Sequence, residues 1–235
     1  NVLGNTKTKD EVIRREFRQM EGAWFATKKI QKSKQRVERL DFFGEVNVET
    51  PPVQGTRDQL DLNISVKEKP TGSFNIGAGV SSSQGVVLTA GITQSNLFGT
   101  GKQLSTQINT SQSNQVYSVS YTNPYYTDDG VSRGFDLYQR NTDTTTTSIS
   151  PYKSYTSGGG VRFGVPIDED ETMHYGLSVE QATYELNESS PVQFHDYVRT
   201  FGTTTNNLLA TVGWTRDSRD SAIYPTDGKV QRAFV

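Results

Sequence analysis

The densest group of potential metal ligands in the sequence is the acidic run DEDE at residues 168–171, which follows Pro166. A calcium-binding loop combines such oxygen ligands with a glycine that permits a sharp turn. This run contains no glycine, so a solvated turn is the favoured interpretation. The two histidines, His174 and His195, are too few and too isolated for a zinc site. The sequence therefore predicts no metal site.

Patterns typical of catalysis or nucleotide binding are also weak. The glycine triplet at residues 158–160 is not followed by a predicted helix, which a phosphate-binding loop requires. No serine lies in the glycine-flanked pattern of a nucleophile elbow. The charged run RDSRD at residues 216–220 could form ion pairs, although a solvated turn is favoured. We therefore expect a protein that is not an enzyme and has no cofactor.

The composition limits the class of protein. The chain has 235 residues, of which 32% are hydrophobic, and it has no cysteine. Its net charge of −2 gives no indication of nucleic-acid binding. No apolar run approaches the roughly 20 residues of a membrane helix, but this does not exclude a membrane protein that crosses with β-strands. No signal peptide is visible.

Residues 1–70 combine helical and strand patterns. Thr8 and Thr27 are the predicted N-caps of two helices, the first of which ends at Gly22. Two strands follow at residues 43–50 and 59–69. The first five residues resemble the end of a preceding element, which suggests a fragment. Together with the two helices and two strands they predict a βααββ module with its helices on one face of the sheet. The apolar helical positions are Val12, Ile13, Phe17, Met20, Ile30, Val37 and Leu40.

After Pro70 the hydrophobic period changes to two and stays there. In residues 175–180, for example, Tyr, Leu and Val alternate with Gly, Ser and Glu. Eight such segments can be found, and a ninth begins at Lys229. Consecutive strands joined by turns predict an antiparallel meander.

Two structures fit this alternation: a soluble sandwich or barrel, and a membrane barrel with a wet interior. Three features favour the membrane barrel. The strand lengths lie near the roughly 9–11 residues that a barrel strand needs to cross a bilayer. The mean hydropathy of −0.63 suits a sheet with one face toward water. Aromatic residues also gather at strand ends, where interfacial girdles form: Phe98, Tyr125, Tyr126, Trp214 and Tyr224.

The alternation of strand directions sorts the loops into two sets. Those on the side of residues 1–70 are 96–101, 123–133, 166–171 and 216–228. Those on the far side are 82–85, 111–114, 141–155 and 187–206. Bacterial single-chain barrels have an even number of strands, so nine strands predict an incomplete barrel, cut within its ninth strand.

Several segments resemble the BamA family of Omp85-type outer-membrane β-barrel assembly factors. GNTKTKDEVIRREFRQMEGAWF at 4–25 and RVERLDFFGEVNVET at 36–50 resemble the last POTRA domain of that family. The segment at 71–105, including its NLFGTG turn, resembles the first three barrel strands. TNPYYTDDGVSRG at 122–134 and YPTDG at 224–228 resemble periplasmic turns.

The resemblance implies a fold and a location. It predicts a fifth, periplasmic POTRA domain at residues 1–70. Residues 71–235 are then about the first nine strands of a 16-stranded barrel in the bacterial outer membrane. The implied function is ATP-independent folding and insertion of outer-membrane proteins. The implied partners are nascent outer-membrane proteins, the lipoproteins of the assembly machine, notably the one that docks on the last POTRA domain, and outer-membrane lipid and lipopolysaccharide.

The resemblance also assigns roles to residues. In the family the first barrel strand forms one side of a lateral gate, where its exposed edge templates incoming strands. One face of that strand is nearly empty here, and valine at Gly77 or Gly79 is expected to stiffen the gate and slow assembly. Docking of the lipoprotein is expected at Arg14, Arg15 and Glu21. The gate residues are Ser73, Phe74, Asn75, Ile76, Gly77, Ala78, Gly79, Val80 and Ser81.

Two other functions remain open from the residues themselves. A two-partner secretion pore or other Omp85-type translocation pore has the same modules, and the YPTDG motif does not exclude it. A soluble β-sheet binding domain is the alternative from another class, and it predicts that residues 71–235 stay monomeric without detergent.

Overall fold

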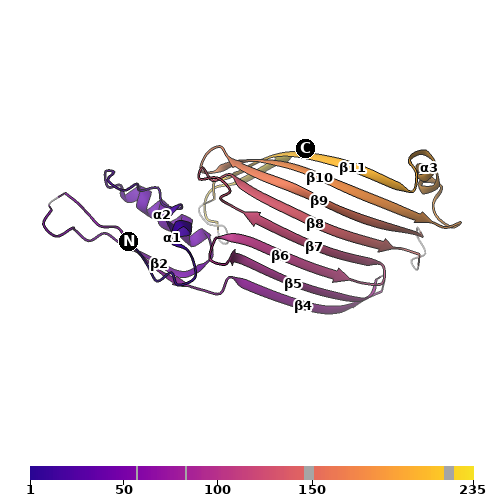
Figure 1. The fold of residues 1–235 in the computed structure, drawn as a ribbon, viewed down its shortest axis with the longest axis horizontal. Helices are drawn as coiled ribbons and strands as arrows, with labels where there is room; N and C mark the ends of the chain where they lie inside the picture. The colour runs from indigo at the N-terminus through magenta and orange to yellow at the C-terminus, as the bar shows by residue number, and fades with distance from the viewer. Residues whose placement is uncertain (57, 83, 146–150, 220–224) are drawn as a thin grey trace. The chain divides into compact units, whose positions relative to one another are not determined.

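The computed structural model contains two units, each with its own β-sheet (Figure 1). The first unit comprises Asn1–Ser73 and Gln94–Lys102, and the second comprises Phe74–Thr93 and Gln103–Val235. None of the described helices is long and apolar enough to cross a membrane. The structure describes residues 1–56, 58–82, 84–145, 151–219 and 225–235.

The first unit has the predicted βααββ order. Its three-stranded sheet has the order β1-β3-β2, in which β1 is parallel and β2 antiparallel to the central strand. The expected strand at residues 59–69 is shorter in the structure, because Leu60 forms only an isolated bridge with Pro52. The elements are β1 (Val2–Leu3), α1 (Asp10–Arg14), α2 (Thr27–Arg39), β2 (Phe43–Glu49) and β3 (Asn63–Glu68).

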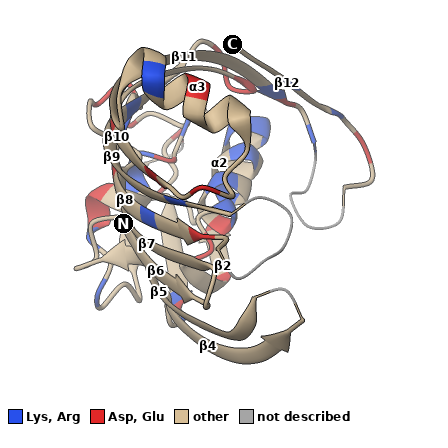
Figure 2. Ribbon diagram, turned by 90° about the vertical axis from the view of Figure 1, so that its right-hand side faces the viewer, with Lys and Arg blue, Asp and Glu red and all other residues tan. Residues whose placement is uncertain are grey.

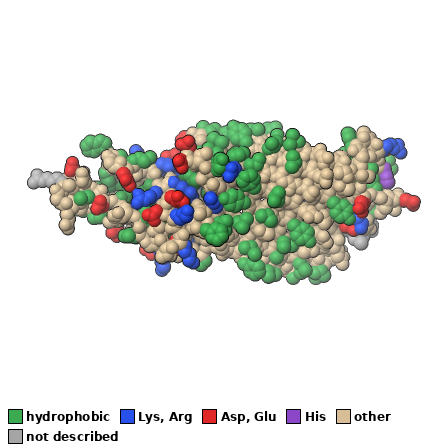
Figure 3. Space-filling view, in the orientation of Figure 1, with side chains coloured by type: hydrophobic (Ala, Val, Ile, Leu, Met, Phe, Trp, Pro, Cys, Tyr) green, Lys and Arg blue, Asp and Glu red, His purple; other side chains and the backbone are tan. Residues whose placement is uncertain are grey.

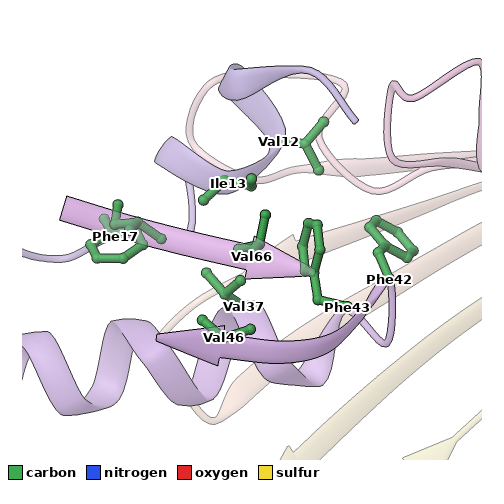
Figure 4. Close-up of a cluster of buried hydrophobic side chains, with 9 residues drawn as sticks. Val12, Ile13, Phe17, Val37, Phe42, Phe43, Val46 and Val66 are labelled. Atoms are coloured by element: carbon green, nitrogen blue, oxygen red, sulfur yellow. The ribbon is translucent and has the colours of Figure 1, made fainter. Parts of the chain in front are cut away.

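A hydrophobic core lies between the helices and the sheet of this unit (Figure 4). Val12 and Ile13 from α1 and Val37 from α2 are fully buried there. They pack with β-branched and aromatic residues that alternate along β2 and β3, as the helical and strand periods predict. The cluster consists of Val12, Ile13, Phe17, Val37, Phe42, Phe43, Val46, Ile64 and Val66.

The first helix is much shorter than its apolar pattern predicts. After Arg15, the bonds from Glu16 N to Ile13 O and from Phe17 N to Arg14 O have i+3 spacing, which tightens the turn. The next amide, of Arg18, donates to the Ser33 hydroxyl on α2 (2.8 Å) instead of continuing the helix.

The predicted caps and one predicted apolar position of these helices are wrong. The N-cap of α1 is Lys9 rather than Thr8, and that of α2 is Ala26, with Thr27 its first helical residue. Neither cap forms a side-chain hydrogen bond. Met20 is exposed rather than on an apolar face.

The second sheet contains nine strands in sequence order from β4 at one edge to β12 at the other, which confirms the predicted meander. Each pair whose register is described is antiparallel. The sheet is open, as expected for an incomplete barrel. The strands are β4 (Gly72–Ser81), β5 (Gly85–Leu97), β6 (Lys102–Thr110), β7 (Asn114–Asn123), β8 (Ser132–Asp143), β9 (Tyr152–Pro166), β10 (Glu171–Leu186), β11 (Thr204–Asp217) and β12 (Val230–Phe234).

Two features of this sheet differ from the prediction. Strand β5 and the strands from β8 to β11 have 12 to 16 residues and exceed the expected length. The loop expected at 187–206 contains a helix, α3 (Val192–Phe201). Phe194 on α3 stacks on Tyr152 of β9, with 4.8 Å between ring centroids. This aromatic packing holds the helix against the strand ends, a contact that local periodicity does not reveal.

The two faces of the strands differ in chemistry. Alternate apolar side chains stand exposed to the surroundings, for example Leu137 of β8 at 65% and Ile76 of β4 at 72%. Hydrophobic side chains gather over the strands in Figure 3, whereas most charged residues lie on helices, turns and strand ends (Figure 2). An exposed apolar band of this kind suits contact with lipid hydrocarbon.

The opposite face is polar and connected by hydrogen bonds across several strands. Tyr138 on β8 donates its hydroxyl hydrogen to Glu180 on β10 (2.6 Å), across the intervening β9. A Cβ at Gly158 of β9 would lie 2.7 Å from the Tyr138 ring. Gly158, the first glycine of the triplet, therefore leaves the space through which the Tyr138 side chain passes over β9 to reach Glu180.

A second polar group on this face joins three strands in the same way. Asp136 of β8 pairs with Arg162 of β9 and accepts a hydrogen bond from the Ser120 hydroxyl of β7 (2.8 Å). Both charged side chains are partly exposed, so water can hydrate them, which suits a wet face rather than a dry core.

Candidate functional site: the free edge of the first barrel strand

Strand β4 lies at one edge of the nine-stranded sheet and, among the described residues, has only β5 as a neighbour. One side of its backbone therefore presents N–H and C=O groups to any strand that approaches. Its apolar face is strongly exposed, with Phe74 at 67%, Ile76 at 72% and Val80 at 87%. This strand contains the residues that the sequence assigned to the gate.

The polar face of β4 carries little side-chain mass. A Cβ at Gly79 would meet nothing within 4 Å, and a Cβ at Gly77 would lie 2.6 Å from the Thr89 hydroxyl of β5. That hydroxyl donates to the Gly77 carbonyl at 3.5 Å, the limit of a hydrogen bond. Side chains therefore add little to the attachment of β4 to its neighbour.

The chain is better attached just before β4 begins. Within the first unit, Ser95 N donates to the Thr71 carbonyl (3.0 Å), and Gln94 Nε2 donates to the Thr71 hydroxyl (2.8 Å). The hydrogen bonds of this segment thus fix the start of the strand.

The predicted docking residues have different environments. Arg14 pairs with Glu21 at 3.1 Å, and both side chains are exposed. Arg15 is largely buried beside Glu16, which pairs with Arg36 of α2 at 2.9 Å. The structure therefore leaves Arg14 and Glu21 accessible, whereas Arg15 supports the fold of the domain.

The sequence analysis missed an exposed apolar group between α1 and α2. Trp24 is 96% exposed, and Met20 and Phe25 are exposed beside it in sequence. An unburied tryptophan next to other apolar side chains is typical of a protein contact surface. The signal was present in the segment MEGAWF at 20–25, where three large apolar residues lie beside the glycine that ends the predicted helix.

A second group that the sequence analysis missed joins the turn at 94–102 to the segment before α1, within the first unit. Asn96 is buried, its Nδ2 donates to the Thr8 hydroxyl (2.8 Å), and its Oδ1 accepts from Gly101 N (2.7 Å). Lys9 N donates to the Gly99 carbonyl (2.9 Å). Thr8, predicted as a helix cap, instead connects these two segments.

Glu68 of β3 holds the same segment from the other side. Its carboxylate accepts hydrogen bonds from the backbone N–H groups of Thr6, Lys7 and Thr8 and from the Thr6 hydroxyl. Partial burial acts to raise the pKa of Glu68, but the hydrogen bonds from Thr8, Thr6 and Lys7 outweigh it and lower the pKa from 4.5 to about 2. The carboxylate is therefore ionised at neutral pH.

The residues considered for metal chemistry stay apart. No group of three His, Asp or Glu side chains in the described ranges is arranged to hold a metal ion. His174 stacks on Phe234 of β12, and His195 lies on α3 with Nε2 at 3.2 Å from the Asn187 carbonyl.

The charged run at 216–220 does form ion pairs, contrary to the solvated turn that the sequence favoured. Arg216 pairs with Glu171 at 3.5 Å, and Arg219 pairs with Asp217 at 2.7 Å. Asp220 lies outside the described residues, as does Tyr224 of the predicted aromatic girdle.

Comparison with known families agrees with the division of the chain into a helix-containing unit and a nine-stranded sheet. The model of the Omp85 superfamily domain matches residues 96–233, more than half of the chain. The chain belongs to the Omp85 superfamily. The POTRA model, described as a surface antigen variable number repeat, matches residues 1–69 of this Omp85 chain.

Among curated relatives, the outer membrane protein assembly factor BamA of Neisseria meningitidis serogroup B is 41% identical over 97% of the Omp85 chain. BamA of Nitratidesulfovibrio vulgaris is 31% identical over 99%. The chain spans 30% and 28% of the lengths of these two relatives. The resemblance to the BamA family is thus confirmed.

Solved structures show the same fold. BamA from Haemophilus ducreyi lacking POTRA domains 1-3 superposes with a TM-score of 0.74 at 30% identity, over 99% of this Omp85 chain and 46% of that one. CdiB from Acinetobacter baumannii superposes with a TM-score of 0.60 at 16% identity, over 100% and 45%, which shows similarity of fold alone. The Omp85 strands therefore lie in the bacterial outer membrane and the POTRA domain in the periplasm, as predicted.

Proposed function

We propose that the protein containing this chain folds and inserts outer-membrane β-barrel proteins, with β4 as the strand that receives them. The observation that carries the proposal is the position of β4 at the edge of the sheet, with only β5 as a neighbour among the described residues. The 41% identity to an outer membrane protein assembly factor supports the same activity. In this proposal the chain is the fifth POTRA domain followed by the first nine strands of a 16-stranded barrel.

The proposed mechanism is β-strand templating. A backbone N–H or C=O group without a partner is costly in hydrocarbon, by several kcal/mol or so. An incoming strand that pairs with the edge of β4 satisfies both backbones as it enters the membrane, so pairing and insertion occur together. The free energy comes from hydrogen bonding and burial, and no ATP, cofactor or catalytic residue of this chain takes part.

Strand β4 suits such exchange for two reasons. Its apolar residues Phe74, Ile76 and Val80 already face outward, where lipid can cover them throughout. The glycines on its other face make few side-chain contacts with β5, so the strand can bend as a new partner replaces an old one.

We further propose that a lipoprotein of the assembly machine docks on the POTRA domain between α1 and α2. The accessible pair Arg14 and Glu21 supplies charge, and Trp24 and Met20 supply apolar area. Interfaces commonly combine such an aromatic anchor with a polar rim. Arg15 contributes by holding Glu16 in place rather than by contact with the partner.

Crosslinking from single cysteines along β4, at residues 73–81, tests the templating proposal in cells that are synthesising outer-membrane proteins. We expect crosslinks to the nascent strand at these positions and none from matched cysteines at Ser118 and Ser120, in the interior of the sheet on β7. Assembly that proceeds with no substrate trapped along β4 would refute the proposal.

A further inference from the structure

The start of strand β8 carries a cation in an unusual environment. Arg133 is the second residue of β8 (Ser132–Asp143) and has the same side-chain parity as Phe135 and Leu137, which are exposed on the apolar face. Strands β4 and β8 run in the same direction in this meander, so β8 starts at the periplasmic end of the sheet. Arg133 therefore lies at the periplasmic boundary of the lipid-facing surface.

The guanidinium group lies against two aromatic rings. Its central carbon lies 3.7 Å from the centroid of the Tyr126 ring and 5.1 Å from that of Phe135. Phe135 in turn stacks on Tyr121 of β7, with 6.5 Å between centroids. Cation–π contact of this kind fixes the plane of the group and leaves its edge free to donate hydrogen bonds.

The turn before β8 places Tyr126 over the guanidinium. Tyr126 N donates to the Val131 carbonyl (2.8 Å), and Gly130 N donates to the Thr127 carbonyl (3.0 Å). Gly130 has a φ of +84°, which favours glycine at this position. The aromatic clamp is therefore built into the backbone of the turn and does not depend on a mobile side chain alone.

Arg133 has no anionic partner within the described part of the chain. None of the ion pairs there includes it, although Asp128 and Asp129 occupy the same turn. Its Nε is shielded from solvent and has no hydrogen-bond partner. A guanidinium group without an anionic partner at a membrane boundary calls for an anion from the bilayer itself.

We propose that Arg133 and Tyr126 form a binding site for the phosphate of a phospholipid headgroup in the periplasmic leaflet. The guanidinium edge donates to the phosphate oxygens, a geometry that arginine matches with two parallel hydrogen bonds. The acyl chains lie along the apolar face of β8, over Phe135 and Leu137. The site anchors the sheet at a fixed depth and lies four strands away from the edge strand β4.

Lipid retention by the full-length protein tests the site. The purified protein in detergent is incubated with phosphatidylglycerol, and bound lipid is counted by native mass spectrometry for unaltered protein, Arg133→Gln and Arg133→Lys. We expect Arg133→Gln to retain lipid with about fivefold lower affinity, since one cation near a bilayer surface contributes about 1 kcal/mol. Lysine keeps the charge but not the planar donors, so Arg133→Lys should be intermediate.

The control removes a different cation from the same unit. Arg199→Gln alters an exposed residue of α3, outside the lipid-facing strands, and should leave retention unchanged. Inorganic phosphate in millimolar excess should not displace the lipid, because it lacks the acyl chains; displacement would indicate a free-phosphate site and overturn the proposal. Equal retention by Arg133→Gln and Arg199→Gln would also overturn it.

A second variant keeps the test decisive if Arg133→Gln does not fold. Tyr126→Leu removes the ring that orients the guanidinium while leaving the charge, and its heat-modifiable mobility shows whether the barrel is folded. Folded Tyr126→Leu should lose affinity as Arg133→Lys does. Full lipid retention by folded Tyr126→Leu and by Arg133→Lys would contradict the site.

Discussion

The two units of this chain bury their apolar residues in opposite ways. The POTRA unit encloses Val12, Ile13 and Val37 in a core from which water is excluded. The barrel sheet leaves Leu137 and its counterparts on an outer face and keeps hydrogen-bonded polar side chains on the other. The hydrophobic effect stabilises the first by packing within the chain, whereas the second depends on the bilayer as its apolar partner.

The largest expected effect separates these two kinds of apolar residue. Ile13→Ala opens a cavity in the POTRA core and should destabilise that unit by about 2–5 kcal/mol. The same substitution at Ile76, which is exposed on β4, should leave the POTRA unit unchanged. Pulse proteolysis of the full protein across a urea series measures both. Equal midpoints for the two variants would break the comparison.

A charge on each face of the sheet tests which face meets lipid. Leu137→Arg should destabilise the folded barrel by about 2–4 kcal/mol if its site is near the bilayer centre. Ser118→Arg, which enters a trough of about 910 Å³ beside Tyr138 and Glu180, should cost much less, because water hydrates the guanidinium there. The measurement is urea unfolding in lipid vesicles, and a larger cost for Ser118→Arg would reverse the assignment of the faces.

Glu68 distinguishes the POTRA unit by its pH dependence. Its pKa is lowered to about 2 in the folded protein, so its stabilisation is fully present above the unfolded value of 4.5 and is lost as the pH falls toward 2. Glu68→Gln should lower the stability of the POTRA unit by about 1–2 kcal/mol at pH 7.

The difference between unaltered protein and Glu68→Gln should shrink as the pH falls from 4.5 toward 2. Glu49→Gln is the control, because Glu49 is exposed on β2 and accepts one hydrogen bond, from Asn47. A pH-independent difference for Glu68→Gln would show that the carboxylate charge does not stabilise the segment before α1.

The smallest expected effect concerns the gate strand. Gly79→Val raises the strand propensity of β4 by up to about 1 kcal/mol and meets no neighbour. If exchange of partners limits the rate, assembly of a substrate barrel should slow by up to about fivefold. Gly77→Val should slow it too, although Thr89 must first move. Unchanged assembly rates in both variants would count against a role for strand flexibility.

Local periodicity predicted most of the architecture and almost none of the long-range contacts. The period of two located all nine strands of the sheet and their exposed residues, since alternation is a property of each strand by itself. The helical spacing of Val12, Ile13 and Phe17 identified the POTRA core but overestimated α1. The competing bond from Arg18 N to Ser33 comes from 15 residues away.

Two other features of the sheet, the helix α3 and the space above Gly158, have a signature in the sequence that the predictions did not include. Phe194, Tyr197 and Phe201 recur at helical spacing within the loop that contains α3, yet a loop was predicted. The glycine triplet at 158–160 was interpreted only as a weak nucleotide-binding pattern. In the structure, Gly158 of β9 leaves space for the Tyr138 side chain of β8, which reaches Glu180 on β10. The resemblance to the BamA family, rather than periodicity, supplied the role of β4, which stays a proposal.

Hydrogen–deuterium exchange of the full-length protein in lipid vesicles tests the central claim most directly, that β4 is a weakly held edge beside a firmly paired sheet. We predict that amides of residues 74–81 exchange before those of residues 134–139 in β8, which has a described neighbour on each side. Protection of the β4 amides equal to that of the β8 amides would contradict the account.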